Sequence, residues 1–462
     1  MGADRFEGMV IGELEARALA LESEQKFDEA RDALDTALRL DPQSQSCAEA
    51  RARVALQLKE VGAAEHCQRA LAFHGGHPER QLRMIETVAV ELGSAAIPLL
   101  EDYIEKHPTN VAAHDQLAEL QAQAGAGEQF VNGYLSALRR HPDCKPLLMS
   151  YWKNLSRSGR LLETLQSMDS KQNLFEGDRE FSLLQVHVAN RGGFADRAGR
   201  LLESLDTHPD AELARGQHRL QTGRPDEAAR LLEEVAIAQP DNQMAWALLE
   251  LAWRITGNPA HHWLAGQRGL YGAIELELGS NQLAAIAAML RTLHGARSHP
   301  LGQSVRGGTQ TRGELLMRAE PEILLLTQAL TTAIQTFLVN LPSPDPRHPL
   351  LRHTNRELAF GPSWSVRLSG GGYHTAHFHP GGIISSACYI SLPDEVANGP
   401  EKPGWLEIGR PPPELGLDLP PLATFQPTAG RLVLFPSFMF HGTRPFAGGE
   451  RLTVAFDLVA TG

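Results

Sequence analysis

The pattern of hydrophobic and polar positions divides the chain into a helical first part and a strand-rich last part. Up to about residue 258 apolar residues recur at helical spacing, for example in 27–34 and 225–232. Helical spacing returns in 281–297 and in 314–341, and this predicts two further helices. Between them, residues 302–313 are rich in Gly, Thr and Gln without apolar periodicity, which predicts a loop.

The helical part is repetitive. Its spaced prolines are Pro42, Pro78, Pro108, Pro142, Pro209 and Pro240, at intervals of 36, 30, 34, 67 and 31 residues. A period near 34 residues is typical of tetratricopeptide repeats, in which antiparallel helix pairs stack into a curved solenoid. Ala30, Ala96 and Ala228 each stand twelve residues before one of these prolines, where a small side chain lets two helices approach closely. We therefore predict an all-α, tetratricopeptide-type solenoid domain over residues 1–258.

Short runs of strand-forming residues, separated by Gly and Pro, dominate the last hundred residues. The predicted strands are 363–369, 373–379, 383–391, 404–408, 431–435, 438–442 and 451–459. Short strands with turns between them are typical of a jelly roll. The predicted fold class is therefore α+β multidomain, with the solenoid followed by a jelly-roll domain and its supporting helices over residues 259–462.

Charge and composition exclude several classes of protein. The net charge of −12, from 43 basic and 55 acidic residues, argues against a nucleic-acid partner. No apolar stretch approaches the ~20 residues that span a bilayer, so no membrane partner is expected. The four cysteines are widely separated and form no Cys-x-x-Cys pair, which fits a reducing compartment and predicts a cytoplasmic protein. The oligomeric state, monomer or homodimer, stays open.

Histidines in the strand-rich part are candidate metal ligands. Residues two apart on an extended strand share a face, so His377 and His379 can bind one ion, whereas His374 is expected to face away. His441 follows a run of strand formers that would present it from a neighbouring strand. Imidazoles suit iron, zinc, copper or nickel. Taken singly, each of these residues would more often be an ordinary surface histidine.

A candidate anion clamp lies ten residues after His441. Arg451 and Thr453 share one face of a predicted strand and offer a fixed cation and a hydroxyl, which together suit a carboxylate. From the residues alone, the sequence thus predicts a non-haem metal site with an anion-binding group beside it.

Ordered motifs strengthen this interpretation across residues 262–462. They are Gln303–Thr311, Ser363–Leu368, Gly371–His374, His377–Pro380, Ser385–Ile390, Leu392–Pro393, Gly404–Glu407, Gly430–Ser437, His441 and Arg451–Thr453. This ordered set resembles the 2-oxoglutarate- and Fe(II)-dependent oxygenases, in particular the bacterial branch fused to tetratricopeptide repeats.

The resemblance implies a double-stranded β-helix that holds Fe(II) through His377, His379 and His441. It further implies that Arg451 pairs with the C5 carboxylate of 2-oxoglutarate, assisted by Thr453 and Tyr389, and that O2 is consumed. Most of the superfamily carries Asp or Glu where this chain has His379. Either His379 is a ligand, or the iron keeps only two protein ligands.

A solenoid fused to such an oxygenase suggests a protein or peptide substrate that the repeats bind and the enzyme hydroxylates on a side chain. Arg306, Thr309 and Gln310 are candidates for the substrate entrance, although the predicted loop could simply hold itself together. Two other functions stay open. One is a three-histidine metal dioxygenase that does not use 2-oxoglutarate, and the other is a non-catalytic repeat adaptor with a vestigial barrel.

Overall fold

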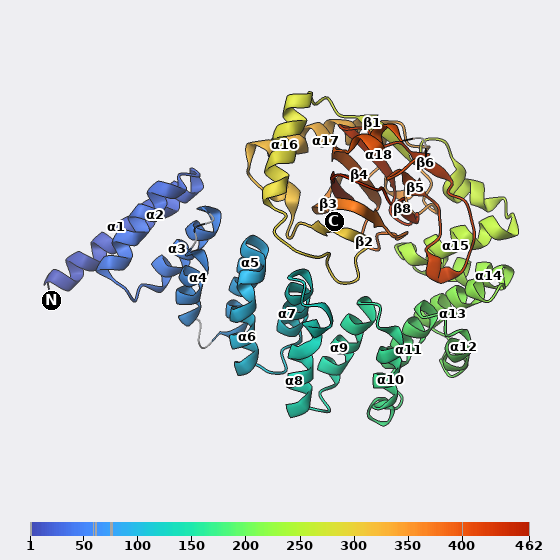
Figure 1. Cartoon of the computed structure of the whole chain (residues 1–462), viewed down its shortest axis with the longest axis horizontal. Helices are drawn as coiled ribbons and strands as arrows, with labels where there is room; N and C mark the ends of the chain where they lie inside the picture. The colour runs from blue at the N-terminus through green and yellow to red at the C-terminus, as the bar shows by residue number, and fades with distance from the viewer. Residues whose placement is uncertain (1, 59, 61, 74–76, 400, 462) are drawn as a thin grey trace. The chain divides into compact units, whose positions relative to one another are not determined.

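The computed structural model describes residues 2–58, 60, 62–73, 77–399 and 401–461. It divides into two compact units, residues 1–151 and 152–462. The first unit is helical, and the second contains further helices followed by an antiparallel β domain (Figure 1). The predicted fold class, a helical repeat region followed by an antiparallel β domain, is therefore confirmed.

Helix pairs in chain order build the first unit. Its elements are α1 (Gly2–Ser23), α2 (Phe27–Leu40), α3 (Gln45–Leu58), α4 (Ala63–Ala72), α5 (Pro78–Leu92), η1 (Gly93–Ala96), α6 (Ile97–Lys106), α7 (Val111–Gln123), η2 (Gly127–Val131) and α8 (Asn132–Arg140). Helix α9 (Lys145–Arg157) crosses the division between the units. Ala30 and Ala96 are fully buried, as expected for small residues that allow close helix packing.

The repeats continue in the second unit. Their elements are α10 (Leu161–Asp169), η3 (Gln172–Phe175), α11 (Arg179–Arg191), α12 (Ala195–Glu203), α13 (Pro209–Gln221), α14 (Pro225–Ala238) and α15 (Gln243–Thr256). Helix α14 starts with Pro225, whose missing N–H costs nothing there, because the first N–H of a helix has no partner within the helix. Ala228 and Leu232 lie on the buried face of α14. A Cβ at Gly216 of α13 would lie 2.6 Å from Leu232, so glycine permits the close contact of this pair.

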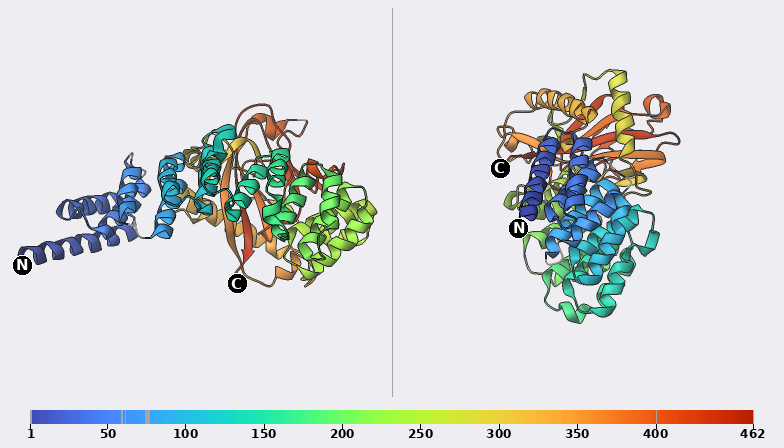
Figure 2. Two further views of the ribbon diagram at one scale, coloured as in Figure 1. Left: turned by 90° about the horizontal axis from the view of Figure 1, so that it is seen from below. Right: turned by 90° about the vertical axis from the view of Figure 1, so that its left-hand side faces the viewer.

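Two antiparallel sheets form the β domain, whose ribbon Figure 2 shows in two further views. The six-stranded sheet has the order β1-β7-β4-β9-β3-β2, and the three-stranded sheet has the order β6-β5-β8. The strands are β1 (Gly272–Glu275), β2 (Val305–Gln310), β3 (Leu358–His374), β4 (Ile384–Ser391), β5 (Leu406–Ile408), β6 (Ala423–Phe425), β7 (Arg431–Pro436), β8 (His441–Thr443) and β9 (Arg451–Ala460). The helical elements are η4 (His262–Gly266), α16 (Ser280–Thr292), η5 (Leu315–Met317), α17 (Pro321–Val339), η6 (Leu351–His353), α18 (Asp394–Asn398) and η7 (Pro413–Leu415).

Strand β9 shows how alternation separates core from site. One set of alternate residues packs in the same apolar core as α16 and α17: Leu452, Val454, Phe456 and Leu458. The residues between them line a cavity on the other side of the sheet: Arg451, Thr453, Ala455 and Asp457. Because successive side chains of a strand point to opposite faces, Arg451, Thr453 and Asp457 all lie on the cavity side.

The last repeats and the β domain share one apolar core, which includes Trp246, Trp253, Tyr389 and Phe435. Polar contacts from the C-terminal ends of the repeat helices α9, α13 and α15 add to it. Arg157 donates to the carbonyl of Leu301 at 2.7 Å, and Gln221 donates to that of Glu414 at 2.8 Å. Arg254 likewise donates to the carbonyl of Gly409 at 2.7 Å.

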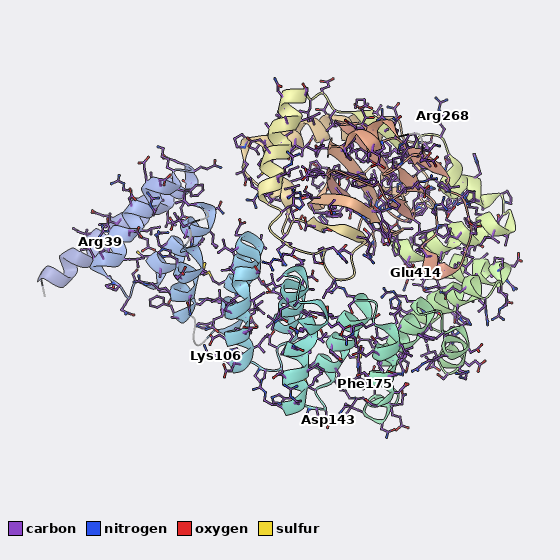
Figure 3. The ribbon with its side chains drawn as sticks, in the orientation of Figure 1. Arg39, Lys106, Asp143, Phe175, Arg268 and Glu414 are labelled. Atoms are coloured by element: carbon purple, nitrogen blue, oxygen red, sulfur yellow. The ribbon has the colours of Figure 1, made fainter. Side chains whose placement is uncertain are left out.

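The domain boundary predicted between residues 258 and 259 falls inside this second unit. It stays a prediction. Figure 3 labels Glu414 where the β domain comes beside the repeat helices.

Several local predictions were wrong. Residues 305–310 form strand β2 rather than part of a loop, and the predicted strands 363–369 and 373–379 begin in one long strand, β3, that ends at His374. Strands β1 and β6, with four and three residues, were not predicted.

Helix α17 corrects the expectation about apolar stretches. By length and composition it is apolar enough to span a membrane, and it is the one such helix among the described residues. Its inner face packs Ile323, Leu326 and Leu330 into the core of the six-stranded sheet. This packing uses one face of α17, while Leu324 and Val339 of the same helix are 56% and 85% exposed.

Candidate metal centre

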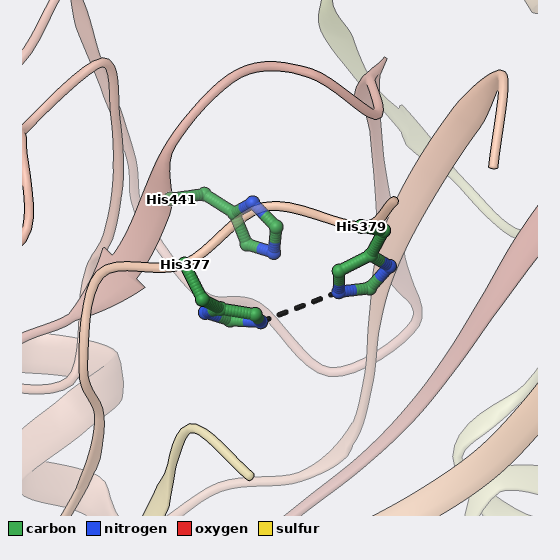
Figure 4. Close-up of side chains that lie close together, drawn as sticks. All are labelled: His377, His379 and His441. Carbon is green, nitrogen blue, oxygen red and sulfur yellow. Dashed lines mark hydrogen bonds between the residues drawn. The ribbon is translucent and has the colours of Figure 1, made fainter. Parts of the chain in front are cut away.

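Backbone pairing brings the three candidate histidines together. His377 follows β3 and forms an isolated bridge with His441, in which each N–H donates to the other residue's carbonyl at 2.9 and 2.8 Å. The N–H of His379 donates to the carbonyl of Ser437 at 3.0 Å. The ligand atoms of the three rings all lie within 4.8 Å of one another, and Nε2 of His377 and Nε2 of His379 are 3.2 Å apart (Figure 4).

Each of these rings has its Nδ1 beside a hydrogen-bond acceptor. Nδ1 of His377 lies 2.9 Å from the carbonyl of Thr375, and Nδ1 of His441 lies 3.0 Å from that of Met439. Nδ1 of His379 lies 2.6 Å from Oδ1 of Asp457. A neutral imidazole that donates from Nδ1 carries a lone pair on Nε2. Three such lone pairs converge here, which is an arrangement that a cation stabilises.

The site also keeps the rings of His377 and His441 neutral. Burial, with the neighbouring His379 next in importance, lowers the pKa of His377 to about 3. Burial and the neighbouring His377 hold the pKa of His441 well below its usual range. Neutral imidazoles at physiological pH are ready to bind a metal ion without first releasing a proton.

His374 does not face away, contrary to the sequence prediction. Its Nδ1 lies 3.0 Å from Oγ of Ser304, and that hydroxyl lies 3.3 Å from Nε2 of His377. Burial, with Arg451 next, holds the pKa of His374 well below its usual range. Because β3 ends at His374, strict alternation does not continue to His377, and the prediction from strand geometry failed.

The proposed anion clamp is buried. Arg451 is 2% exposed, its Nη1 donates to the carbonyl of Gly404 at 2.9 Å, and its guanidinium carbon lies 5.2 Å from the centre of the Tyr389 ring. Nε of Arg451 and the hydroxyl of Tyr389 have no hydrogen-bond partner among the residues described. Thr453 is the strand partner of Tyr389. Arg451 lines the cavity, so its unused Nε can bind a carboxylate that enters there, whereas Tyr389 is not among the lining residues.

One cavity of about 530 Å³ connects the histidines with the clamp. The three histidines, Arg451 and Thr453 line it, together with Trp364, Ser386 and Leu406 from three different strands. The cavity therefore lies between the two sheets.

The three proposed entrance residues differ in their positions. Gln310 lines the cavity. Oγ1 of Thr309 instead lies 2.8 Å from Nδ1 of His294, because neighbouring strand residues point to opposite faces. The guanidinium of Arg306 donates to the carbonyls of Gln303 and Val305. Neither Thr309 nor Arg306 lines the cavity itself, although Gln303, which accepts from Arg306, does; their place at the entrance stays a prediction.

Sequence reasoning missed several cavity residues, among them Asp457 and Arg157. Asp457 lies on the same β9 face as Arg451 and Thr453, so an extension of the alternation by four residues would have found it. Arg157 also lines the cavity, although it belongs to repeat helix α9. No sequence pattern links a repeat helix to the loop that contains Leu301, so the position of Arg157 in the cavity could not be predicted.

Comparison with protein families agrees with this geometry. The 2OG-Fe(II) oxygenase family matches residues 362–457, and the tetratricopeptide repeat family matches residues 15–78 and 213–260. The chain carries a 2OG-Fe(II) oxygenase domain after tetratricopeptide repeats. The oxygenase match begins within β3 and ends at Asp457, so it contains all three histidines and the clamp.

Solved structures similar to parts of the chain include oxygenases and repeat proteins. A Pseudomonas putida prolyl-4-hydroxylase is 18% identical with a TM-score of 0.31, and the match covers 42% of this chain and 94% of that one. HygX from Streptomyces hygroscopicus, with nickel and 2-oxoglutarate bound, is 14% identical with a TM-score of 0.25, covering 42% and 83%. A Parabacteroides merdae tetratricopeptide repeat protein is 13% identical with a TM-score of 0.31, covering 53% and 99%. A search of the curated proteins found no match.

The groups that a 2OG-Fe(II) oxygenase family implies fit the residues present. Three imidazole nitrogens suit Fe(II), and they leave coordination positions for other ligands. The buried guanidinium of Arg451, which lines the cavity, suits the distant carboxylate of a dicarboxylic acid. The three histidines and Arg451 line the same cavity. The cavity can therefore hold a metal ion and a carboxylate side by side.

Proposed function

We propose that this protein is a 2-oxoglutarate- and Fe(II)-dependent dioxygenase that hydroxylates a side chain of a protein or peptide bound by its helical repeats. The observation that carries the proposal is the pairing, in one cavity, of three converging Nε2 atoms with a buried arginine that lacks an anionic partner among the residues described. The free state of all four cysteines supports a reducing, cytoplasmic setting.

The residues have separate tasks in this proposal. His377, His379 and His441 hold Fe(II), and Arg451, with Tyr389 and Thr453, binds the C5 carboxylate of 2-oxoglutarate. Bound Fe(II) supplies the oxidative chemistry, in which 2-oxoglutarate, O2 and a C–H bond become succinate, CO2 and a C–OH group. The protein orients the co-substrate, and the apolar walls that Trp364 and Leu406 contribute limit the access of water.

A protein or peptide substrate is supported by the way the repeats reach the cavity. Arg157, at the end of repeat helix α9, lines the cavity and also donates to the loop carbonyl of Leu301. A substrate that enters here passes a side chain of the repeat array. Solenoids of this class commonly bind extended peptide segments.

Succinate formation tests the chemistry. The purified protein is supplied with Fe(II), 2-oxoglutarate and O2, and succinate is measured with and without peptides captured by the full-length chain. Peptides that gain the mass of one oxygen atom, with wild-type protein but not with the His441→Ala variant, would support hydroxylation.

A three-histidine dioxygenase that does not use 2-oxoglutarate is the second candidate, because His379 supplies a third imidazole. That enzyme would consume O2 without releasing succinate. If the protein took up no metal under anaerobic reconstitution, the non-catalytic adaptor would be favoured instead.

A further inference from the structure

His379 differs from the other two candidate ligands in the group behind it. His377 and His441 have neutral backbone carbonyls beside Nδ1, whereas His379 has the carboxylate of Asp457 at 2.6 Å. Both members of this pair are buried, with His379 8% and Asp457 5% exposed. A carboxylate that accepts from the Nδ1–H of a ligand fixes the ring orientation and makes the imidazole a stronger donor.

A small network holds Asp457 in place. Oγ of Ser385 donates to Oδ1 of Asp457 at 2.7 Å, and Ser385 and Ser437 are linked through their hydroxyls at 2.8 Å. A Cβ at Gly382 would lie 2.5 Å from Oγ of Ser437 and 3.0 Å from Cγ of Asp457, so glycine leaves room for the network. The carboxylate is therefore fixed independently of His379.

The charge of Asp457 has no cationic side chain to balance it. Within the described part of the chain, the only ion-pair partner of Asp457 is His379, which is charged only when protonated. A buried carboxylate without a counter-ion is unfavourable, because burial removes its hydration. A divalent cation on Nε2 of His379 would provide the missing charge on the other side of the same ring.

We propose that Asp457 is a positioning residue that supplies, through His379, the negative charge that a carboxylate ligand gives to most related sites. Three neutral imidazoles leave a divalent ion with two positive charges, and the Asp457 carboxylate lowers the total to one. This total equals that of a site with two histidines and one carboxylate. The inference rests on the proposed metal site and specifies how that site tolerates His379.

Cobalt binding tests the proposal without catalysis. The full-length protein is titrated anaerobically with Co(II), and the dissociation constant and the visible absorption spectrum of the complex are recorded. Asp457→Asn keeps the shape and an oxygen acceptor but removes the charge. It is expected to weaken Co(II) binding by about 10- to 100-fold and to shift the spectrum.

Two controls separate charge from local structure. Ser385→Ala disturbs the same network but keeps the carboxylate, so Co(II) affinity is expected to stay within about threefold of wild type, well below the loss for a removed outer partner. Asp345→Asn changes an aspartate that accepts from Nε1 of Trp263 at 2.8 Å, outside the residues that line the cavity, and should leave Co(II) binding unchanged.

The His379→Asp background gives the decisive comparison. In it, the ligand at position 379 would itself be a carboxylate, and no imidazole would connect Asp457 to the metal. Asp457→Asn should therefore weaken Co(II) binding far less in this background than in the wild type. The difference between the two backgrounds carries the test, because a purely structural loss would be equal in both.

Two results would overturn the proposal. One is unchanged Co(II) affinity in Asp457→Asn, and the other is an equal loss of affinity in both backgrounds, which would indicate a purely structural role. Failure of the wild-type protein itself to bind Co(II) would instead remove the proposed metal site, so the two failures can be distinguished.

Discussion

Replacement of Arg451 by Met tests the anion clamp through two opposite effects. The Arg451 guanidinium is buried, Nε lacks a hydrogen-bond partner in the described part of the chain, and no acidic side chain there pairs with it. Burial lowers the pKa of Arg451, which reflects the unfavourable environment of the charged form. A buried cation of this kind is expected to destabilise the free protein and to bind an anion strongly.

The magnitudes follow from the contacts that an anion would gain. A hydrogen bond to a charged group contributes about 1.5–3 kcal/mol, so the loss of a bidentate pair should weaken 2-oxoglutarate binding by at least about 3 kcal/mol. At 1.4 kcal/mol for each factor of ten, this is roughly a 100-fold increase in Kd. In the absence of 2-oxoglutarate, Arg451→Met should unfold at the same temperature as wild type or higher, because an unpaired buried charge has been replaced by an apolar side chain.

Thermal unfolding in the presence of Zn(II), which is redox-inert, measures both effects. A concentration of 2-oxoglutarate that is 100 times the wild-type Kd should stabilise wild type by about 2.7 kcal/mol and the variant hardly at all. Arg444→Met is the matched control, because Arg444 pairs with Glu407 at 2.8 Å outside the residues that line the cavity. If Arg451→Met melted earlier without ligand yet kept the wild-type shift, Arg451 would be a structural residue and the clamp assignment would be wrong.

Other predictions concern the metal ligands and the stability of the second unit. His441→Ala should lose tight Fe(II) binding, because one of three converging nitrogens is removed; stoichiometric iron after gel filtration would contradict this. His379→Asp should retain metal while His379→Ala loses affinity, and equal affinities in calorimetric titrations would mean that the iron keeps two protein ligands. Burial lowers the pKa of His348 from 6.5 to about 4. As the pH falls from 6.5 to 4, the unfolded chain binds a proton that the folded chain does not, so the free energy of unfolding should fall by up to ~3 kcal/mol. Urea unfolding should show a shallower pH dependence for His348→Asn. Trp152→Ala should cost about 3–5 kcal/mol in urea unfolding, because Trp152 is fully buried in the repeats.

Periodicity was sufficient to predict the main architecture. The proline period located the repeats, and the alternation of Arg451 and Thr453 placed both residues on one side of β9, where the structure has them. Periodicity failed where a glycine allows close packing of two strands and does not form a turn. A Cβ at Gly308 would lie 2.4 Å from the carbonyl of Arg367, so glycine in β2 allows close strand contact, although in the sequence it indicates a loop.

Long-range contacts were beyond the reach of sequence patterns. The hydroxyl of Ser304 and the guanidinium of Arg157 come to the cavity from a loop and a repeat helix, and no local periodicity specifies such contacts. The pairing of His377 with His441 was anticipated because the motifs occur in a known order, whereas the side chains that support them depend on this chain alone.

The register of β9 links the folding of the domain to its chemistry. Arg367 is paired with Leu452 and Tyr389 with Thr453, and this register directs Arg451, Thr453 and Asp457 to the cavity. A shift by one residue would turn all three polar side chains into the apolar core beneath α16 and α17, so the hydrophobic residues of the strand strongly disfavour it. The burial that stabilises the sheet therefore also places the anion clamp and the Asp457 carboxylate in the same cavity as the metal ligands. A substitution that weakens the packing of Val454 or Phe456 should consequently reduce Co(II) and 2-oxoglutarate binding together, whereas changes to Asp457 or Arg451 should reduce mainly one of them.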